Sequence, residues 1–322
     1  MGKYIKLFST HAEYQAFIQT DDFILPNVSY CEDQTDVVHY NPWTWAEEYL
    51  TFVALEDGTF QLSTNAVSYS LDDGETWTEL AAATASPTVT AGNKIMWKGE
   101  LTPSSSNGIG TFTATGNFDV QGNVMSLLYG DNYKGQTDLT GKTYAFYRLF
   151  SGNKKIINAE NLSLPATTLA QRCYYGMFEG CLSLVTAPEL PATTLADSCY
   201  GGMFGSCTNL TTAPSLPATT LAQSCYGSMF SICTSLTTAP ELPATTLVGY
   251  CYSNMFKGCS SLNYIKAMFT TTPSGSSPNY YTQSWVSRVA ASGTFVKNSA
   301  AQWNVTGING IPTNWTVQTA SE

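Results

Sequence analysis

Hydrophobic positions repeat with a fixed period of 26 residues in the second half of the chain. Four copies begin at Leu164, Leu190, Leu216 and Leu242, and each starts with Leu-Pro-Ala-Thr-Thr-Leu. Cys-Tyr, Met-Phe, Cys and Leu then follow at the same offsets in every copy. A period in the twenties is typical of units that stack on one another, because a single unit cannot bury its own apolar face. The pattern therefore predicts a stack of like units over residues 164–267.

The offsets within one copy predict a short helix followed by a short strand. In the third copy the apolar residues are Leu221, Cys225, Met229, Phe230 and Cys233. They recur every three or four residues, which we interpret as one stripe of a helix. The Thr-rich segment after them ends at a proline, as expected for a strand that stops at a residue without an N–H. Each unit is thus predicted to add one strand and one helix to a curved solenoid.

The repeats resemble the BspA-type leucine-rich repeats of bacterial surface proteins. The resemblance rests on the Cys-x2-Leu spacing after Met-Phe and on the proline-bearing strand that follows, over residues 164–267. It implies a leucine-rich-repeat solenoid and a role in adhesion. The start of the chain, Tyr4-Ile-Lys-Leu-Phe8 and then Leu25 to Asp33, looks like the openings of structural proteins of phages that infect gut Bacteroidales. That second resemblance implies a virion component.

The segments on both sides of the repeats are predicted to be caps. Tyr147 to Asn153 has the spacing of Tyr-Gly-Met-Phe-x-Gly-Cys, with Asn153 in place of the cysteine. Residues 141–163 therefore predict an atypical first repeat, as terminal units usually are. Residues 268–322 predict a C-terminal cap. Its expected elements are a helical turn at 284–289, a strand at 293–297 and an edge strand near 314–317.

Alternating apolar and polar residues predict short strands in the first half. Leu50–Ala54 and Thr111–Thr115 alternate, and glycine turns separate such runs. We expect an antiparallel, sandwich-like β domain over residues 45–140. Residues 1–44 are expected to be a small attachment segment with one short helix near His11. The predicted fold class is therefore mixed α/β and modular, with the β domain followed by the capped leucine-rich-repeat solenoid.

Composition restricts the class of partner. The chain has 322 residues, is 12% charged and carries a net charge of −10, with 14 Lys and Arg and no basic run. Phosphate binding needs clustered basic residues, so we expect no nucleic acid partner. No run of about 18 apolar residues is present, so we expect no membrane insertion. The start has no secretory signal peptide, which predicts a chain not exported by the general secretory route.

Catalytic side chains are scarce. The chain has two histidines and three arginines, too few for schemes that need several of either. Ser70 to Trp77 matches the Asp-box pattern of sialidases, Ser-x-Asp-x-Gly-x-x-Trp, which we interpret as a tight hairpin turn. We expect no catalytic residues, no metal site and no cofactor. The repeat cysteines have neither zinc-ligand spacing nor histidine partners, so we expect buried free thiols, with a few disulfides left open.

Positions that differ between the copies indicate where a binding surface lies. In the first copy they are 171–172, 175–176, 179–180 and 182–183. Among these positions and their equivalents we select a candidate contact surface. Its residues are Arg172, Tyr175, Glu179, Asp197, Tyr250 and Lys257. Drift on a solvated face is the competing explanation.

These patterns predict a non-enzymatic surface-recognition or adhesion protein. The leading hypothesis is a phage virion-associated structural or receptor-binding appendage on the virion surface. Its partners would be a host surface protein or glycan and, through the N-terminal segment, other virion proteins; a homo-oligomer is left open. The alternative is a bacterial cell-surface leucine-rich-repeat adhesin. A second alternative is a glycan-active enzyme that uses the β domain.

Overall fold

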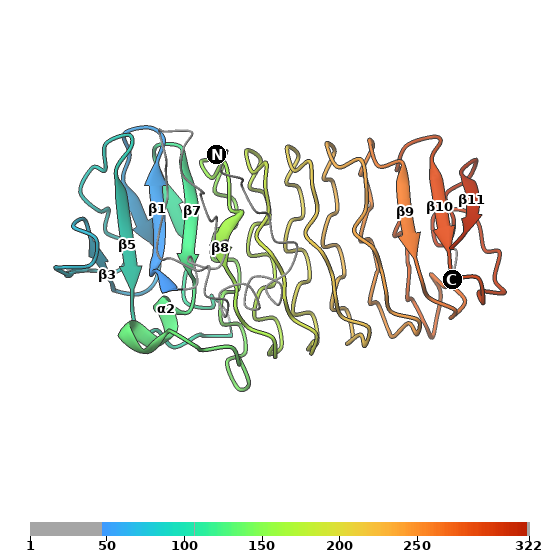
Figure 1. Cartoon of the computed structure of the whole chain (residues 1–322), viewed down its shortest axis with the longest axis horizontal. Helices are drawn as coiled ribbons and strands as arrows, with labels where there is room; N and C mark the ends of the chain where they lie inside the picture. The colour runs from blue at the N-terminus through green and yellow to red at the C-terminus, as the bar shows by residue number, and fades with distance from the viewer. Residues whose placement is uncertain (1–46, 106, 321–322) are drawn as a thin grey trace, which may run out of the picture.

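The computed structural model describes residues 47–105 and 107–320. Figure 1 shows an elongated body with antiparallel strands at one end, stacked repeats in the middle and the sheet β11-β10-β9 at the C-terminal end. The predicted attachment segment 1–44 and its helix lie outside the described residues.

The strands form sheets of six, three and two strands. The described strands are β1 (Leu50–Ala54), β2 (Phe60–Leu62), β3 (Val67–Ser70), β4 (Thr78–Leu80), β5 (Lys94–Lys98), β6 (Phe112–Ala114), β7 (Phe118–Asn123), β8 (Asn161–Ser163), β9 (Tyr264–Ala267), β10 (Thr294–Lys297) and β11 (Thr316–Thr319). The largest sheet has the order β4-β3-β5-β1-β7-β8, and the small ones are β2-β6 and β11-β10-β9. The predicted strands at 50–54, 111–115 and 293–297 are confirmed as β1, β6 and β10.

The antiparallel strands continue into the repeats without a break in the core. β8, which precedes the first repeat, pairs in parallel with β7. Phe52 of β1 contacts Phe112 at 5.0 Å between ring centroids, and Phe112 stacks on Phe150 at 6.0 Å. Phe150 in turn stacks on Phe178 of the first repeat at 5.3 Å. One hydrophobic core therefore runs through both parts.

The predicted mixed α/β solenoid is wrong. Within the described residues the helical segments are α2 (Ser126–Tyr129) and the 3-10 turn η2 (Gly130–Asn132), and neither lies in a repeat. The repeats also form no continuous solenoid sheet. Their Thr-rich segments make isolated parallel bridges such as Thr186 to Thr212. Prolines 188, 214 and 240 follow these bridges and cannot donate to a ladder. In the last copy Lys266 stands in place of that proline, and the four-residue strand β9 forms.

A ten-residue ribbon of successive turns replaces the predicted helix in each repeat. These turn ribbons span 143–152, 171–180, 197–206, 223–232 and 249–258, and a shorter one spans 281–288 in place of the predicted helical turn. Every fourth residue has a positive φ, as at Arg172 (54°), Gly176 (59°) and Gly180 (74°). Two inward residues therefore alternate with two outward residues along the ribbon.

Backbone amides of the ribbons are satisfied in two directions. Cys173 N–H donates to Ala170 three residues back, and the next such bond is from Tyr175 N–H to Arg172. The amides between them donate to the following unit, as Tyr174 N–H does to the Cys199 carbonyl at 3.0 Å. Buried backbone groups need such partners. Successive ribbons are therefore in direct hydrogen-bond contact, rather than separated like packed helices.

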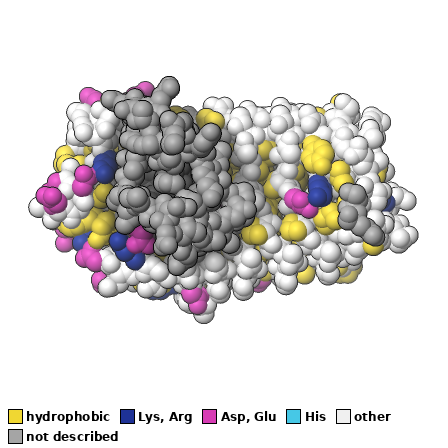
Figure 2. All heavy atoms as spheres, in the orientation of Figure 1, with side chains coloured by type: hydrophobic (Ala, Val, Ile, Leu, Met, Phe, Trp, Pro, Cys, Tyr) yellow, Lys and Arg dark blue, Asp and Glu magenta, His cyan; other side chains and the backbone are white. Residues whose placement is uncertain are grey.

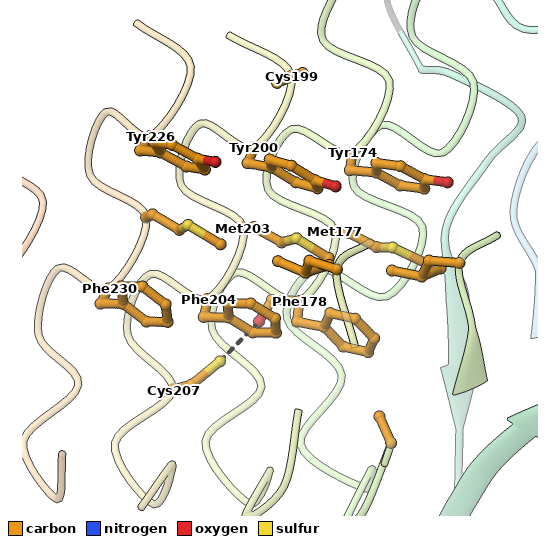
Figure 3. Close-up of a cluster of buried hydrophobic side chains, with 14 of the residues drawn as sticks. Tyr174, Met177, Phe178, Cys199, Tyr200, Met203, Phe204, Cys207, Tyr226 and Phe230 are labelled. Atoms are coloured by element: carbon orange, nitrogen blue, oxygen red, sulfur yellow. Dashed lines mark hydrogen bonds between the residues drawn. The ribbon is translucent and has the colours of Figure 1, made fainter. Parts of the chain in front are cut away.

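Identical inward residues form ladders along the stack. Tyr174, Tyr200, Tyr226 and Tyr252 stack at 5.7, 5.9 and 6.0 Å between neighbouring centroids. Parallel rows of Met and Phe lie beside them (Figure 3). Burying a large apolar side chain contributes about 1.5–3 kcal/mol, which accounts for the identity of these positions between copies.

The eight repeat cysteines are buried free thiols, as predicted. The second cysteine of each unit donates to a phenylalanine carbonyl of the preceding unit, as Cys207 Sγ does to Phe178 O at 3.1 Å (Figure 3). Burial raises the pKa of Cys207 to about 12, so this thiol keeps its proton. Asn153 lies in the equivalent place in the first cap and donates from Nδ2 to Phe112 O at 3.1 Å.

Candidate functional site

The outward residues of the turn ribbons form one continuous surface, which we call the ribbon face. It is made of the pairs 171–172, 175–176 and 179–180 and their equivalents in the other ribbons. They are three of the four pairs of positions that differ between copies. All six residues of the predicted contact surface lie on it, whereas the variable pair 182–183 lies beyond the ribbon.

Arg172 is held between two tyrosines at the N-terminal end of the ribbon face. Its Nη1 donates to the hydroxyl of Tyr144 at 2.8 Å. The centre of the guanidinium lies 5.6 Å from the Tyr144 ring centroid and 6.0 Å from that of Tyr175. Such contacts favour a cation over the ring face. No carboxylate of the described residues forms an ion pair with Arg172, although its side chain is exposed.

A second arginine, Arg148, belongs to the same group of side chains as Arg172 and Tyr175. Arg148 makes an ion pair with Glu179 at 3.1 Å, with both side chains nearly half exposed. Tyr147 stacks on Tyr175 at 5.5 Å and lies 5.5 Å from the Arg148 guanidinium. We call Tyr144, Tyr147, Arg148, Arg172, Tyr175 and Glu179 the arginine–tyrosine cluster. Its ion pair is exposed, so we expect it to contribute little to stability.

Large outward side chains lean onto glycines of the next unit. A Cβ added at Gly201 would lie 2.8 Å from the ring of Tyr175. One added at Gly258 would lie 3.3 Å from the Ile232 side chain. The glycine in one copy is therefore matched to the bulky residue in the copy before it.

The remaining predicted residues lie farther along the face. Asp197 is exposed in the second repeat, where its carbonyl accepts the Arg172 N–H. Tyr250 stacks on Tyr280 at 5.1 Å in the fourth, and Lys257 is exposed in the same ribbon. Ribbons 197–206 and 223–232, in the second and third repeats, present mainly Ser and Gly on their outward side. The structure therefore places Arg172, Tyr175 and Glu179 near one end of the ribbon face and Tyr250 and Lys257 near the other, with Asp197 between these two groups.

Sequence reasoning missed the ribbon-face residues that the caps contribute. Tyr144 and Arg148 precede their repeat equivalents by 28 residues, and Tyr280 and Arg288 follow theirs by 30. Because these spacings differ from 26 residues, aligning the chain with the 26-residue period did not identify these residues as equivalents. The similarity of 147–153 to the repeats was a sufficient signal for the first two.

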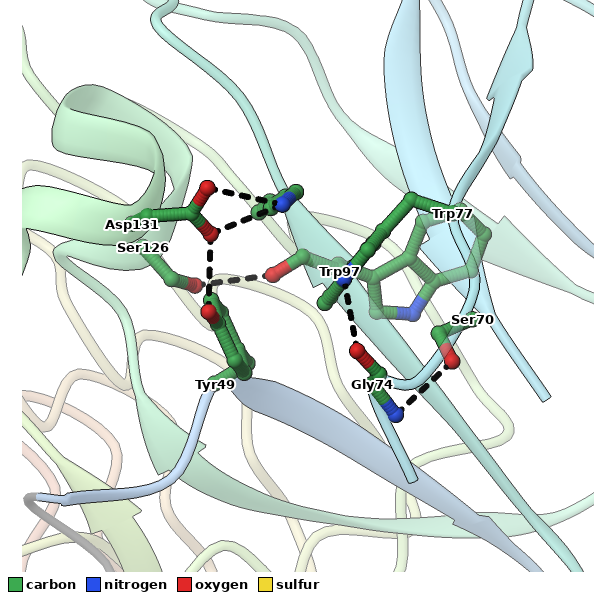
Figure 4. Close-up of polar contacts among 8 residues, drawn as sticks. Tyr49, Ser70, Gly74, Trp77, Trp97, Ser126 and Asp131 are labelled. Atoms are coloured by element: carbon green, nitrogen blue, oxygen red, sulfur yellow. Dashed lines mark hydrogen bonds and ion pairs between the residues drawn. The ribbon is translucent and has the colours of Figure 1, made fainter. Parts of the chain in front are cut away.

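The Asp-box residues form the predicted tight hairpin turn between β3 and β4. Gly74 N–H donates to Ser70 Oγ at 2.9 Å, and Trp77 Nε1 donates to the Gly74 carbonyl at 3.0 Å (Figure 4). The Lys98 ammonium lies 4.3 Å from the Trp77 ring and pairs with Asp131 at 2.7 Å. These contacts fasten the hairpin to the segment after α2, and we assign the turn no chemical role.

Two negative observations concern the part of the chain that the structure describes. No helix there is long and apolar enough to cross a bilayer. No three His, Cys, Asp or Glu side chains there come together as metal ligands.

Comparison with known proteins gives no relative. No family model matches the chain, and no curated protein or solved structure is similar to it.

Proposed function

We propose that the protein is a non-enzymatic surface-recognition protein that contacts its partner through the ribbon face. One observation carries the proposal. The Cys, Tyr, Met and Phe residues that are identical between copies are buried in the core, whereas the outward residues of the ribbon face differ between copies and include aromatic and charged side chains near both ends. Tyrosine and arginine are the residues that most often anchor recognition surfaces.

The proposed setting is the surface of a phage virion, where the protein would be a structural or receptor-binding appendage. Support for this setting is the resemblance of the first residues to structural proteins of phages of gut Bacteroidales. The alternative is an adhesin on a bacterial cell surface. Detection of the protein in purified virions would favour the first, and detection on intact uninfected cells the second.

The test is binding of the labelled full-length chain to intact cells of a panel of gut Bacteroidales strains. Two variants alter the face by inserting the residues that the second and third copies carry. They are Tyr175→Gly and Tyr250→Ser. The equivalent residues in the second and third copies are Gly201 and Gly227 for the first variant, and Ser198 and Ser224 for the second. Leu182→Thr makes the same kind of exchange away from the ribbons and is the control.

We expect the wild-type chain and Leu182→Thr to bind a subset of strains, and the double variant Tyr175→Gly/Tyr250→Ser to bind at least about tenfold more weakly. Binding to no strain, or equal binding by all three proteins, would overturn the proposal.

A further inference from the structure

The ribbon face is the basic side of an acidic protein. The chain carries a net charge of −10, and the visible face in Figure 2 shows acidic side chains gathered at the end that holds the antiparallel strands. All three arginines of the chain lie instead on the turn ribbons, together with Lys257. The acidic side chains on these ribbons are Glu179, which is paired with Arg148, and Asp197. Unpaired positive charge therefore predominates on this face.

Each arginine occupies a backbone conformation that residues other than glycine adopt at a cost. Their φ values are 54° at Arg148, 54° at Arg172 and 64° at Arg288. The fold does not require arginine there, since Ser198 and Ser224 fill the position of Arg172 at φ 56° and 54°. The positive φ therefore belongs to the ribbon itself, whereas the choice of arginine at 172 does not.

The Arg172 guanidinium has N–H groups available to bind an oxyanion. One of its five N–H groups is used by Tyr144, and the guanidinium lies near the rings of both Tyr144 and Tyr175. No other described side chain accepts a hydrogen bond from it. A planar guanidinium held in this way matches the two oxygens of a carboxylate or sulfate group.

We infer that the ribbon face binds an acidic polysaccharide, with Arg172 holding a carboxylate or sulfate group of the chain. The inference rests on the proposed function and names its ligand class. Ribbons 197–206 and 223–232 present Ser hydroxyls, which can donate to and accept from sugar hydroxyls, and one acidic side chain, Asp197. Serine is under-represented among the residues that anchor protein–protein interfaces. Basic residues at both ends suit an extended ligand that lies along the stack.

The test is equilibrium binding of the full-length chain to four immobilised probes at low and at physiological salt. Polygalacturonate presents carboxylates, dextran sulfate presents sulfates, neutral dextran presents neither, and poly-L-glutamate presents carboxylates on a peptide. We expect binding to one or both acidic polysaccharides, none to dextran, and at least about tenfold weaker binding to polyglutamate. The preferred probe identifies the oxyanion.

Three variants locate the binding. Arg172→Ser inserts the residue of the next two copies and is expected to weaken binding about tenfold or more, because a charge-assisted hydrogen-bond pair is lost. Arg172→Lys keeps the positive charge without the planar guanidinium, so its affinity should lie between those of the wild type and Arg172→Ser. Lys266→Gln removes one charge from β9, outside the ribbons, and should leave the affinity unchanged.

The inference is overturned if neither acidic polysaccharide binds, if polyglutamate binds as tightly, or if Arg172→Ser and Lys266→Gln lose affinity equally. If wild-type protein still binds cells in any of these cases, the ligand class alone is wrong. If it binds neither cells nor probes, the proposed function falls as well.

Discussion

Replacing Tyr226 by phenylalanine is expected to make the protein more stable. The side chain is 2% exposed, and its hydroxyl has no hydrogen-bond partner among the described residues. Phenylalanine retains the ring, which stacks on Tyr200 at 5.9 Å and on Tyr252 at 6.0 Å. The ladder already accepts phenylalanine, because Phe146 stacks on Tyr174 at 5.5 Å.

The magnitude follows from the lost hydration of the hydroxyl. Burying a hydroxyl without a partner costs about 1–3 kcal/mol by protein mutational data. Tyr226→Phe removes that group and leaves no cavity next to the ring, so the free energy of unfolding should rise by about 1–3 kcal/mol. Tyr133→Phe is the control, since the Tyr133 hydroxyl donates to the Glu47 carbonyl. Loss of this hydrogen bond should lower the free energy of unfolding by about 1 kcal/mol.

Urea unfolding followed by tryptophan fluorescence and circular dichroism measures both effects as shifts of the midpoint at constant slope. Because stacked units unfold partly independently, hydrogen exchange of the amides in ribbons 223–232 and 249–258 measures the stability of the stack around residue 226. If Tyr226→Phe destabilises as much as Tyr133→Phe, the buried hydroxyl has a partner, such as an ordered water, and the reasoning is refuted.

Three further outcomes are expected. Ile232→Asn should raise the stability by about 1 kcal/mol, because isoleucine at φ 65° is strained and its side chain is 48% exposed; a lower unfolding midpoint would contradict this. Hydrogen bonds from Thr76 and Ser70 lower the pKa of Asp72 to about 2, so the turn should be fully stabilised above its unfolded pKa of about 3.9 and lose that contribution as pH falls through 2. Near-ultraviolet circular dichroism should report this loss, and Asp72→Asn should abolish it. In a Cys31→Ser background the repeat thiols should not react with a disulfide-exchange reagent at pH 8 until the protein is unfolded, since burial raises the pKa of each; rapid reaction of the native protein would show that the stack opens.

The helix prediction failed because two backbone patterns share similar apolar spacing. An α-helix turns about 100° per residue, so a stripe repeated every four residues drifts by about 40° at each step. Leu221, Cys225, Met229 and Cys233 keep the strict four-residue spacing, and the turn ribbon maintains it with a left-handed residue in every fourth place. Glycine usually signals that conformation. Here several of the positions hold bulky residues such as Ile232, which hid the signal.

The sequence by itself determined the stacking period, the apolar residues that face the core and the candidate residues that face outward, whereas it left open whether any repeat cysteines form disulfides. These follow from local spacing, because side-chain direction repeats with the backbone. Only the tertiary structure decided that half of the ribbon amides bond to the next unit, since those partners lie 25 residues away. It also decided that Tyr144 and Arg148 join Arg172 and Tyr175 in one cluster. That contact depends on how a cap with a different loop length comes into register with the stack, and the side chains meet only after the backbones have paired.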